Sequence, residues 1–219
     1  MPMLELDRSL FALLNGAWIT PWLDQAMPLV TNAKLWAPFL AVAWLWLLLG
    51  AGGRWRPLAL CLLLAIGLSD LVSARVVKPL VGRDRPCIAE PTARLLVSRT
   101  SSRSFPSSHA ANTGAAAGVA WAEAGWAAGL PVLLLALAVS WSRVYVGVHY
   151  PLDVFAGLCL GLAIARIVIL VRRRWWPVPP PGPVGPVAPG SPADLSTREG
   201  SPAAAGPREP VPPPSSAGG

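Results

Sequence analysis

The sequence predicts an all-α protein, a multi-pass transmembrane bundle of five to six helices with an N-terminal interfacial helix. Hydrophobic residues make up 53% of the 219 residues and charged residues only 13%, against roughly 25% in soluble domains. The apolar residues are concentrated before Trp176, because 14 of the 25 prolines lie beyond it. A soluble enzyme, a disulfide-stapled secreted domain and a sequence-specific DNA binder are therefore poor interpretations, and we expect no nucleic acid partner.

The first predicted part of the chain, residues 1–35, is an amphipathic interfacial segment. Residues 3–15 place apolar side chains at helical spacing among Glu5, Asp7 and Arg8. This acidic start lacks the positively charged beginning of a cleaved signal peptide. A helix lying at the membrane interface is the better interpretation.

The second part, residues 36–176, is predicted to be embedded in the membrane. The third of its apolar segments is rich in Ala and Gly, which let neighbouring helices approach closely, so we expect it inside the bundle. The loop of residues 78–105 carries six basic residues and must lie outside the hydrocarbon. The five predicted spans are residues 36–50, 57–77, a segment that starts near Ser107, 126–141 and 152–171. A span needs about 20 residues to cross the membrane, so the shorter ones are expected to extend beyond these bounds.

Positive flanks predict which ends face the cytoplasm. Arg54, Arg56 and the cluster 172–174 fall on one side if the five spans alternate. The loop 78–105 and the turn 143–151 then share the extracytoplasmic face. The loop 78–105 holds more basic residues than the predicted cytoplasmic flanks, which conflicts with a simple count. We resolve this by assigning several of its basic residues to a functional site. The tail, residues 177–219, is rich in Pro, Gly, Ser and Ala and is predicted to be disordered and cytoplasmic.

The chain has only two histidines, and each stands among residues that suit phosphate. His109 follows Ser107 and Ser108 at the start of the Ala-rich segment. Free backbone amides and two hydroxyls at a helix N-terminus form an anion seat, at whose rim His109 can donate a proton. A purely structural helix start would give a similar sequence.

His149 and Asp153 are one helical turn apart, so the carboxylate can bind one ring nitrogen and leave the other nucleophilic. Arg143, at the end of the preceding span, can reach the same face. A structural His–Asp pair at a turn is the alternative. Charged groups at the ends of membrane spans favour the functional interpretation.

A third cluster, Lys78 to Pro86, lies where the second span ends. As a charge run it can simply anchor the helix among headgroups, but the spacing of Lys78 and Arg85-Pro86 gains weight beside the other two clusters. Arg83 and Asp84 are given no role. Asp70 is predicted to form a structural pair with Arg75. The three cysteines, which show no metal-binding spacing, are interpreted as packing residues: Cys61, Cys87 and Cys159.

Together the three clusters resemble the type 2 phosphatidic acid phosphatase superfamily, whose motifs read K-x6-RP, PSGH and SR-x5-H-x3-D. They occur here in that order, at Lys78 to Pro86, Pro106 to His109 and Ser142 to Asp153. The resemblance covers roughly residues 57–170. Ser108 replaces the commoner Gly of the second motif, which puts the geometry of that backbone amide in question.

The resemblance implies a role for each motif residue. His149 attacks phosphorus and forms a phosphohistidine, while Asp153 orients it and stabilises the imidazolium. His109 protonates the leaving oxygen and then activates water. No metal or cofactor is expected, since too few His and carboxylate residues remain for a two-metal phosphatase. The expected phosphate-binding residues are Lys78, Arg85, Ser107, Ser108 and Arg143.

The leading functional hypothesis is an integral membrane lipid phosphatase acting at the outer face. An isoprenoid diphosphate such as undecaprenyl diphosphate is the first candidate substrate, followed by phosphatidylglycerol phosphate and phosphatidic acid. Two hypotheses of other classes are a vanadium-dependent haloperoxidase and a non-catalytic lipid-binding or transport protein. Expected partners are the lipid phosphate and membrane lipids, and no residue pattern assigns an oligomeric state.

Overall fold

The computed structural model describes residues 2–176, and every regular element in that range is a helix. The predicted tail, residues 177–219, lies outside the described residues and stays a prediction. The elements are α1 (Pro2–Gly16), α2 (Pro21–Val30), α3 (Ala33–Leu45), η1 (Trp46–Gly50), η2 (Gly53–Trp55), α4 (Arg56–Leu71), η3 (Val72–Val77), α5 (Lys78–Val81), α6 (Pro86–Ala89), α7 (Ser108–Ala124), α8 (Trp126–Tyr145) and α9 (Pro151–Trp175).

Four described helical segments are long and apolar enough to cross a membrane: Ala33–Gly50, Arg56–Ala89, Trp126–Tyr145 and Pro151–Trp175. The remaining predicted span is α7, whose 17 residues rise about 25 Å at 1.5 Å per residue, slightly less than a typical hydrocarbon core. The predicted all-α membrane bundle is confirmed. The helices are placed as expected, although their ends differ from the predicted ends by several residues.

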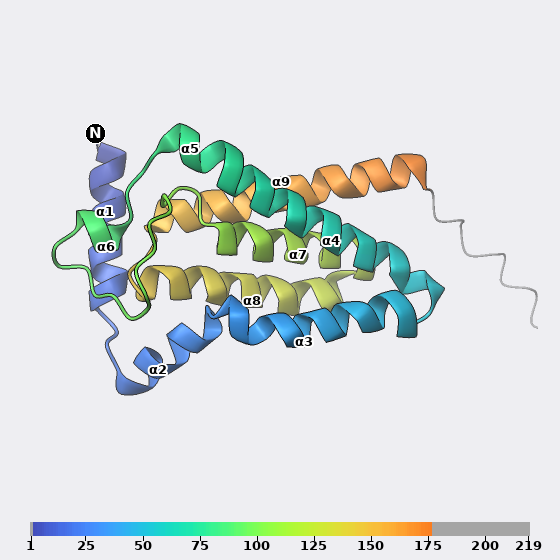
Figure 1. Ribbon diagram of the computed structural model, residues 1–219, viewed down its shortest axis with the longest axis horizontal. Helices are drawn as coiled ribbons and strands as arrows, with labels where there is room; N and C mark the ends of the chain where they lie inside the picture. The colour runs from blue at the N-terminus through green and yellow to red at the C-terminus, as the bar shows by residue number, and fades with distance from the viewer. Residues whose placement is uncertain (1, 177–219) are drawn as a thin grey trace, which may run out of the picture. The chain divides into compact units, whose positions relative to one another are not determined.

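Helix α7 lies at the centre of the bundle and packs against α4, α8 and α9 (Figure 1). Its contact with α9 is close because α9 carries glycine where the backbones meet. A Cβ on Gly157 would come within 2.5 Å of the Ser107 carbonyl oxygen, and one on Gly161 within 2.0 Å of the Ala111 carbonyl oxygen. These glycines therefore set the N-terminus of α7 directly beside the N-terminal part of α9.

The turn between α8 and α9 is held from two sides. Gly147 has φ +84°, and a Cβ there would lie 2.2 Å from the Arg94 carbonyl oxygen, so only glycine fits. Asn15 of α1 accepts a hydrogen bond from the Arg94 backbone N–H (2.8 Å) and donates to the Tyr145 carbonyl (2.7 Å). The N-terminal segment thus packs on the turn that carries His149.

Elements α1, α2, α5, α6 and the loop before α7 gather at one end of the bundle, where α1 runs across the helix ends (Figure 1). At the other end of α7, Glu123 pairs with Arg172 of α9 at 2.7 Å. Buried Cys61 and Cys87 agree with the predicted packing role, whereas Cys159 is exposed on α9 and fills no core position.

Candidate active site

The residues of the three sequence clusters converge where α8 ends and α7 and α9 begin. The Ser107 backbone N–H donates to the Asp153 carbonyl at 2.9 Å, which ties the start of α7 to the first turn of α9. The backbone N–H groups of Val148 and His149 donate to the Arg143 carbonyl at 3.2 and 3.3 Å. Arg143 and His149 are thereby held on one short turn beside Ser107.

His149 is only 1% exposed, and its two ring nitrogens meet different partners. Nδ1 lies 3.5 Å from Oδ2 of Asp153, and Nε2 lies 3.1 Å from Nη1 of Arg85. A guanidinium can only donate, so Nε2 must accept and the ring proton must sit on Nδ1, facing Asp153. This tautomer leaves the Nε2 lone pair on the side of the cations.

Burial lowers the pKa of His149 to about 3. The hydrogen bond to Asp153 opposes this shift, while the charges of Arg85 and Arg143 reinforce it. The imidazole is therefore neutral at physiological pH, the state that a nucleophile requires.

The carboxylate of Asp153 is completely buried and fully engaged. Oδ2 accepts hydrogen bonds from the Ser104 hydroxyl and from the Tyr150 backbone N–H (2.9 Å). Oδ1 accepts from Nη1 of Arg83 at 2.8 Å. With its donors coming from three separate segments, this carboxylate has a fixed orientation toward the His149 ring.

Three buried cations form a group beside this imidazole, in which Arg85 contacts Nε2 and Arg143 interacts electrostatically with the ring. Lys78, Arg85 and Arg143 are 9%, 4% and 8% exposed. Lys78 interacts electrostatically with both arginines, and within residues 2–176 none of the three forms an ion pair. Since buried charges are normally paired, this cluster can receive an anion.

Two further polar atoms support an anion seat. In the part of the chain that the structure describes, the Ser107 hydroxyl and Nε of Arg143 are buried without hydrogen-bond partners. Ser107 occupies the N-cap position of α7, but its side chain does not cap the helix. The Ser108 hydroxyl behaves differently, because it hydrogen-bonds Ser73 of η3 at 2.9 Å. Ser108 can therefore contribute its backbone rather than its side chain.

His109 lies in the first turn of α7, on the same side as the cations. It interacts electrostatically with Arg143, Lys78 and Arg85, and its ring also interacts with the backbone of Thr31. Thr31, which follows α2, accepts a hydrogen bond from Nη1 of Arg143 at 2.6 Å. The eight predicted site residues thus gather at one place, together with the end of α2.

Sequence reasoning missed several members of this site. Ser102 binds Nε and Nη2 of Arg85 through its carbonyl (2.8 Å) and hydroxyl (2.9 Å). Ser104 binds Asp153, and Arg83 pairs with both Asp153 and Asp7. The serine-rich stretch 101–104 beside the phosphate motifs was a usable signal for the two serines. No local pattern links Asp7 to the site.

Other polar groups near the site have structural partners. Asp84 pairs with Arg103, and Arg94 pairs with Asp24 at 2.6 Å. The predicted pairing of Asp70 with Arg75 is wrong: among the described residues Asp70 accepts a hydrogen bond from Asn112 of α7 at 3.3 Å and forms no ion pair with Arg75. The bundle places α7 beside α4, so a partner on the neighbouring helix replaces the one along the chain.

A neutral buried imidazole that faces unpaired cations, at one end of an apolar helical bundle, defines a membrane-embedded phosphoryl-transfer enzyme. The comparisons with known proteins agree. The family model described as PAP2 superfamily matches residues 58–177, and the chain belongs to this family. It is accordingly a hydrolase of phosphate esters or diphosphates, as the motif resemblance implied.

Individual relatives match most of the chain. The Escherichia coli (strain K12) protein named "Putative undecaprenyl-diphosphatase YbjG" is 35% identical over 166 residues, 73% of this chain and 80% of the relative. Lipid A 4'-phosphatase of Bacteroides thetaiotaomicron is 33% identical over 168 residues, 72% of each chain. The crystal structure of Aquifex aeolicus LpxE aligns with a TM-score of 0.61 at 28% identity, covering 75% of this chain and 95% of that one.

Proposed function

We propose that this protein removes phosphate from a membrane lipid phosphate or diphosphate through a phosphohistidine on His149. The observation that carries the proposal is the group of three buried cations, Lys78, Arg85 and Arg143, of which Arg85 contacts Nε2 of His149 and none forms an ion pair among the described residues. A phosphoryl group can enter between Arg85 and Nε2 in place of their direct contact. Its equatorial oxygens can then bind the three cations, and no existing ion pair has to break.

In the proposed reaction, the Nε2 lone pair attacks phosphorus and the bond from phosphorus to the leaving oxygen breaks. Asp153 stabilises the positive charge that develops on the ring, and His109 donates a proton to the leaving oxygen. In the second half, His109 accepts a proton from water, whose oxygen attacks phosphorus while the bond from phosphorus to Nε2 breaks, so that phosphate leaves and the His149 imidazole is restored. Lys78, Arg85 and Arg143 hold the equatorial oxygens, with the Ser107 hydroxyl as a further donor.

For the substrate we propose an isoprenoid diphosphate of the undecaprenyl diphosphate type. The name of the Escherichia coli relative supports this choice, while the name of the Bacteroides relative makes lipid A phosphate an alternative. Phosphatidylglycerol phosphate and phosphatidic acid are further candidates. The proposed site residues bind the phosphate group, so other parts of the protein must recognise the lipid chain.

The decisive experiment measures phosphate release by the purified protein in detergent from these four lipids. We expect the largest kcat/KM for undecaprenyl diphosphate and no release by His149→Gln. A larger value for another lipid would replace the substrate assignment. No release from any lipid, with vanadate-dependent halide oxidation instead, would favour a haloperoxidase. Tight lipid binding without turnover would favour a transport or binding protein.

We also propose that the site faces the extracytoplasmic side and the tail the cytoplasm. The support is that Arg56 and the cluster 172–174 lie at the opposite end of the bundle from the site (Figure 1). Cys87 is buried, so it is a poor reporter of sidedness.

Two exposed positions are better suited to a thiol-labelling test. Ser101 lies in the loop at the site end, and Gly53 lies between α3 and α4 with open space for a side chain. In intact cells, a membrane-impermeant thiol reagent should label Ser101→Cys and spare Gly53→Cys. The reverse pattern would invert the proposed orientation.

A further inference from the structure

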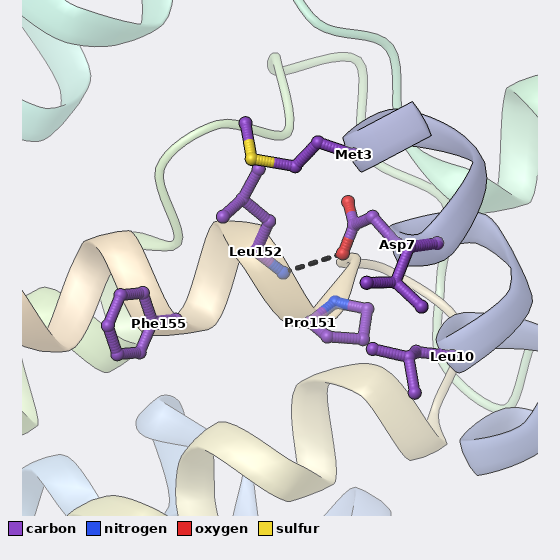
Figure 2. A pocket seen from close by; sticks show the side chains of 7 residues that line it. Met3, Asp7, Leu10, Pro151, Leu152 and Phe155 are labelled. Atoms are coloured by element: carbon purple, nitrogen blue, oxygen red, sulfur yellow. Dashed lines mark hydrogen bonds between the residues drawn. The ribbon is translucent and has the colours of Figure 1, made fainter. Parts of the chain in front are cut away.

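The N-terminal helix α1 places one buried carboxylate against the site end of the bundle. Asp7 is only 5% exposed. Its Oδ1 accepts a hydrogen bond from the Leu152 backbone N–H at 2.8 Å, and its Oδ2 accepts one from Nη2 of Arg83 at 2.6 Å. Figure 2 shows the first of these bonds, with Asp7 reaching from α1 to the N-terminus of α9.

The surroundings of Asp7 explain why these two bonds matter. Asp7 lines a pocket of about 200 Å³ between α1 and α9 whose other lining residues are apolar (Figure 2). A carboxylate beside such residues is costly unless it is paired. The apolar lining consists of Met3, Leu6, Leu10, Pro151, Leu152 and Phe155.

Arg83 continues the connection toward the reacting histidine. While Nη2 binds Asp7, Nη1 binds Oδ1 of Asp153 at 2.8 Å, and the guanidinium carbon lies 3.9 Å from the centre of the Tyr150 ring. Two carboxylates and an aromatic face thus fix the plane of one guanidinium. The other oxygen of Asp153 faces Nδ1 of His149. A continuous series of polar contacts therefore runs from α1 to the nucleophile.

Arg83 links the two carboxylates of this series through its two Nη atoms. Arg83 stands between two carboxylates, so each carboxylate has one cationic partner while the guanidinium is shared. Without the charge of Asp7, Arg83 loses the anchor that holds its Nη2 and can turn away from Asp153. The carboxylate that orients His149 would then lose its only ion pair to an arginine among the described residues.

We propose that Asp7 is a positioning residue for phosphoryl transfer: it holds Arg83, and Arg83 holds Asp153 in the orientation that keeps the proton on Nδ1 of His149. Asp7 lies outside residues 58–177, the part matched by the family model. Helix α1 would therefore complete a site whose proposed reacting groups all lie within the part matched by the family model. The kinetic consequence rests on the proposed phosphatase function, whereas the effect on the His149 tautomer does not.

The first measurement compares the kinetics of Asp7→Asn with those of two matched carboxylate variants. Glu5→Gln changes an exposed carboxylate on the same helix, and Asp84→Asn changes the exposed partner of Arg103. Because partners that orient a reacting group typically contribute about 10- to 100-fold, we expect Asp7→Asn to lower kcat about 10-fold with KM unchanged. Both control variants should keep wild-type kcat. Wild-type kcat in Asp7→Asn would overturn the proposal.

A double variant separates positioning from general support of the fold. If Asp7 acts through Arg83, Asp7→Asn combined with Arg83→Gln should lose no more kcat than the more severe single variant. Fully multiplicative losses would show that the two residues act independently and would contradict the proposal.

The second measurement reads the tautomer directly and needs no substrate. The chain has only two histidines, so a ¹⁵N-histidine-labelled sample in detergent shows two imidazoles, assigned with His109→Gln. We expect wild-type His149 to carry its proton on Nδ1 and Asp7→Asn to increase the fraction protonated on Nε2, while Glu5→Gln leaves the wild-type spectrum.

This spectrum also distinguishes the two possible failures. An unchanged His149 tautomer in folded Asp7→Asn overturns the positioning role, whatever the activity. Absence of phosphatase activity in the wild type overturns the proposed function and leaves the tautomer result standing. If Asp7→Asn does not fold, Arg83→Lys provides the second variant: it keeps the charge but cannot bind both carboxylates as a fork, so it should produce the same tautomer shift. An unchanged spectrum there would equally overturn the proposal.

Discussion

Nη1 of Arg85 lies 3.1 Å from Nε2 of His149, and this contact determines how the site works. Because arginine cannot accept, the nitrogen that faces it must be unprotonated. In the proposed mechanism, the guanidinium therefore lies beside the nucleophilic nitrogen, on the side from which phosphate would approach.

His149→Gln should abolish turnover, and Asp153→Asn should lower kcat by about 10³- to 10⁴-fold, because the amide can stabilise the wrong tautomer of the ring. The measurement is kcat in detergent together with acid-quenched trapping of the ³²P-labelled intermediate. Both variants should retain the wild-type elution volume on gel filtration. A phosphorylated residue other than His149 would overturn the nucleophile assignment.

Vanadate should inhibit competitively, since it adopts the five-coordinate shape of phosphorus in transfer. Arg143→Ala should raise the vanadate Ki by at least about 10-fold, because it removes a buried charge-assisted donor. Arg103→Ala, which removes an exposed arginine paired with Asp84, is the control and should leave Ki unchanged.

Thorough chelation should leave phosphate release largely intact, since three fixed cations are proposed to do the work that divalent metals do elsewhere. The measurement compares kcat before and after dialysis against a chelator. Activity that disappears and then returns with one specific divalent metal would contradict the mechanism.

Stability should fall as the pH drops from about 6.5 toward 3. Folded His149 binds a proton only near a pKa of about 3, whereas the unfolded residue binds one near about 6.5. The unfolded state therefore gains the proton first, at about 1.4 kcal/mol per pH unit for one histidine. Hydrogen bonds from Tyr145 and Arg94 lower the pKa of Asp24, so this carboxylate stays ionised over most of the range.

The measurement is the Tm in detergent at about pH 7 and about pH 5 for the wild type and His149→Gln. The wild type should lose more Tm between the two values than the variant does. Equal losses would show that His149 titrates normally in the folded protein.

Gly161→Leu should reduce both Tm and phosphate release, because a side chain there meets the Ala111 carbonyl and must separate α7 from α9. Ser107 and His109 would then move away from Asp153. Gly67→Ala in α4 is the matched control, since a Cβ there has nothing within 4 Å. It should leave activity unchanged and Tm equal or slightly raised.

Removal of residues 177–219 should leave kcat and Tm nearly unchanged, because a segment this rich in Pro and Gly offers little apolar surface for packing. The comparison needs the truncated protein at the same detergent concentration as the full chain. A folded truncated protein with most of its turnover lost would contradict the interpretation of the tail.

The helical bundle could be predicted from the sequence alone, and so could the proposed reacting groups. Long apolar segments must be helical in a membrane, because their backbone groups have no other partners. Motif spacing then placed His149 and Asp153 one turn apart, and it predicted that Lys78 and Arg85 bind phosphate. These inferences depend on neighbours along the chain, which a sequence displays directly.

Contacts between polar side chains on different helices could be identified only from the tertiary structure. Asp70 accepts a hydrogen bond from Asn112 on a neighbouring helix and does not pair with Arg75, which lies five residues further along the chain. Asp7 lies 146 positions before Asp153 in the numbering, yet Arg83 joins them because α1 crosses the end of the bundle. Such partners are set by how helices pack, and packing depends on side-chain shape summed over the whole bundle, which no local spacing records.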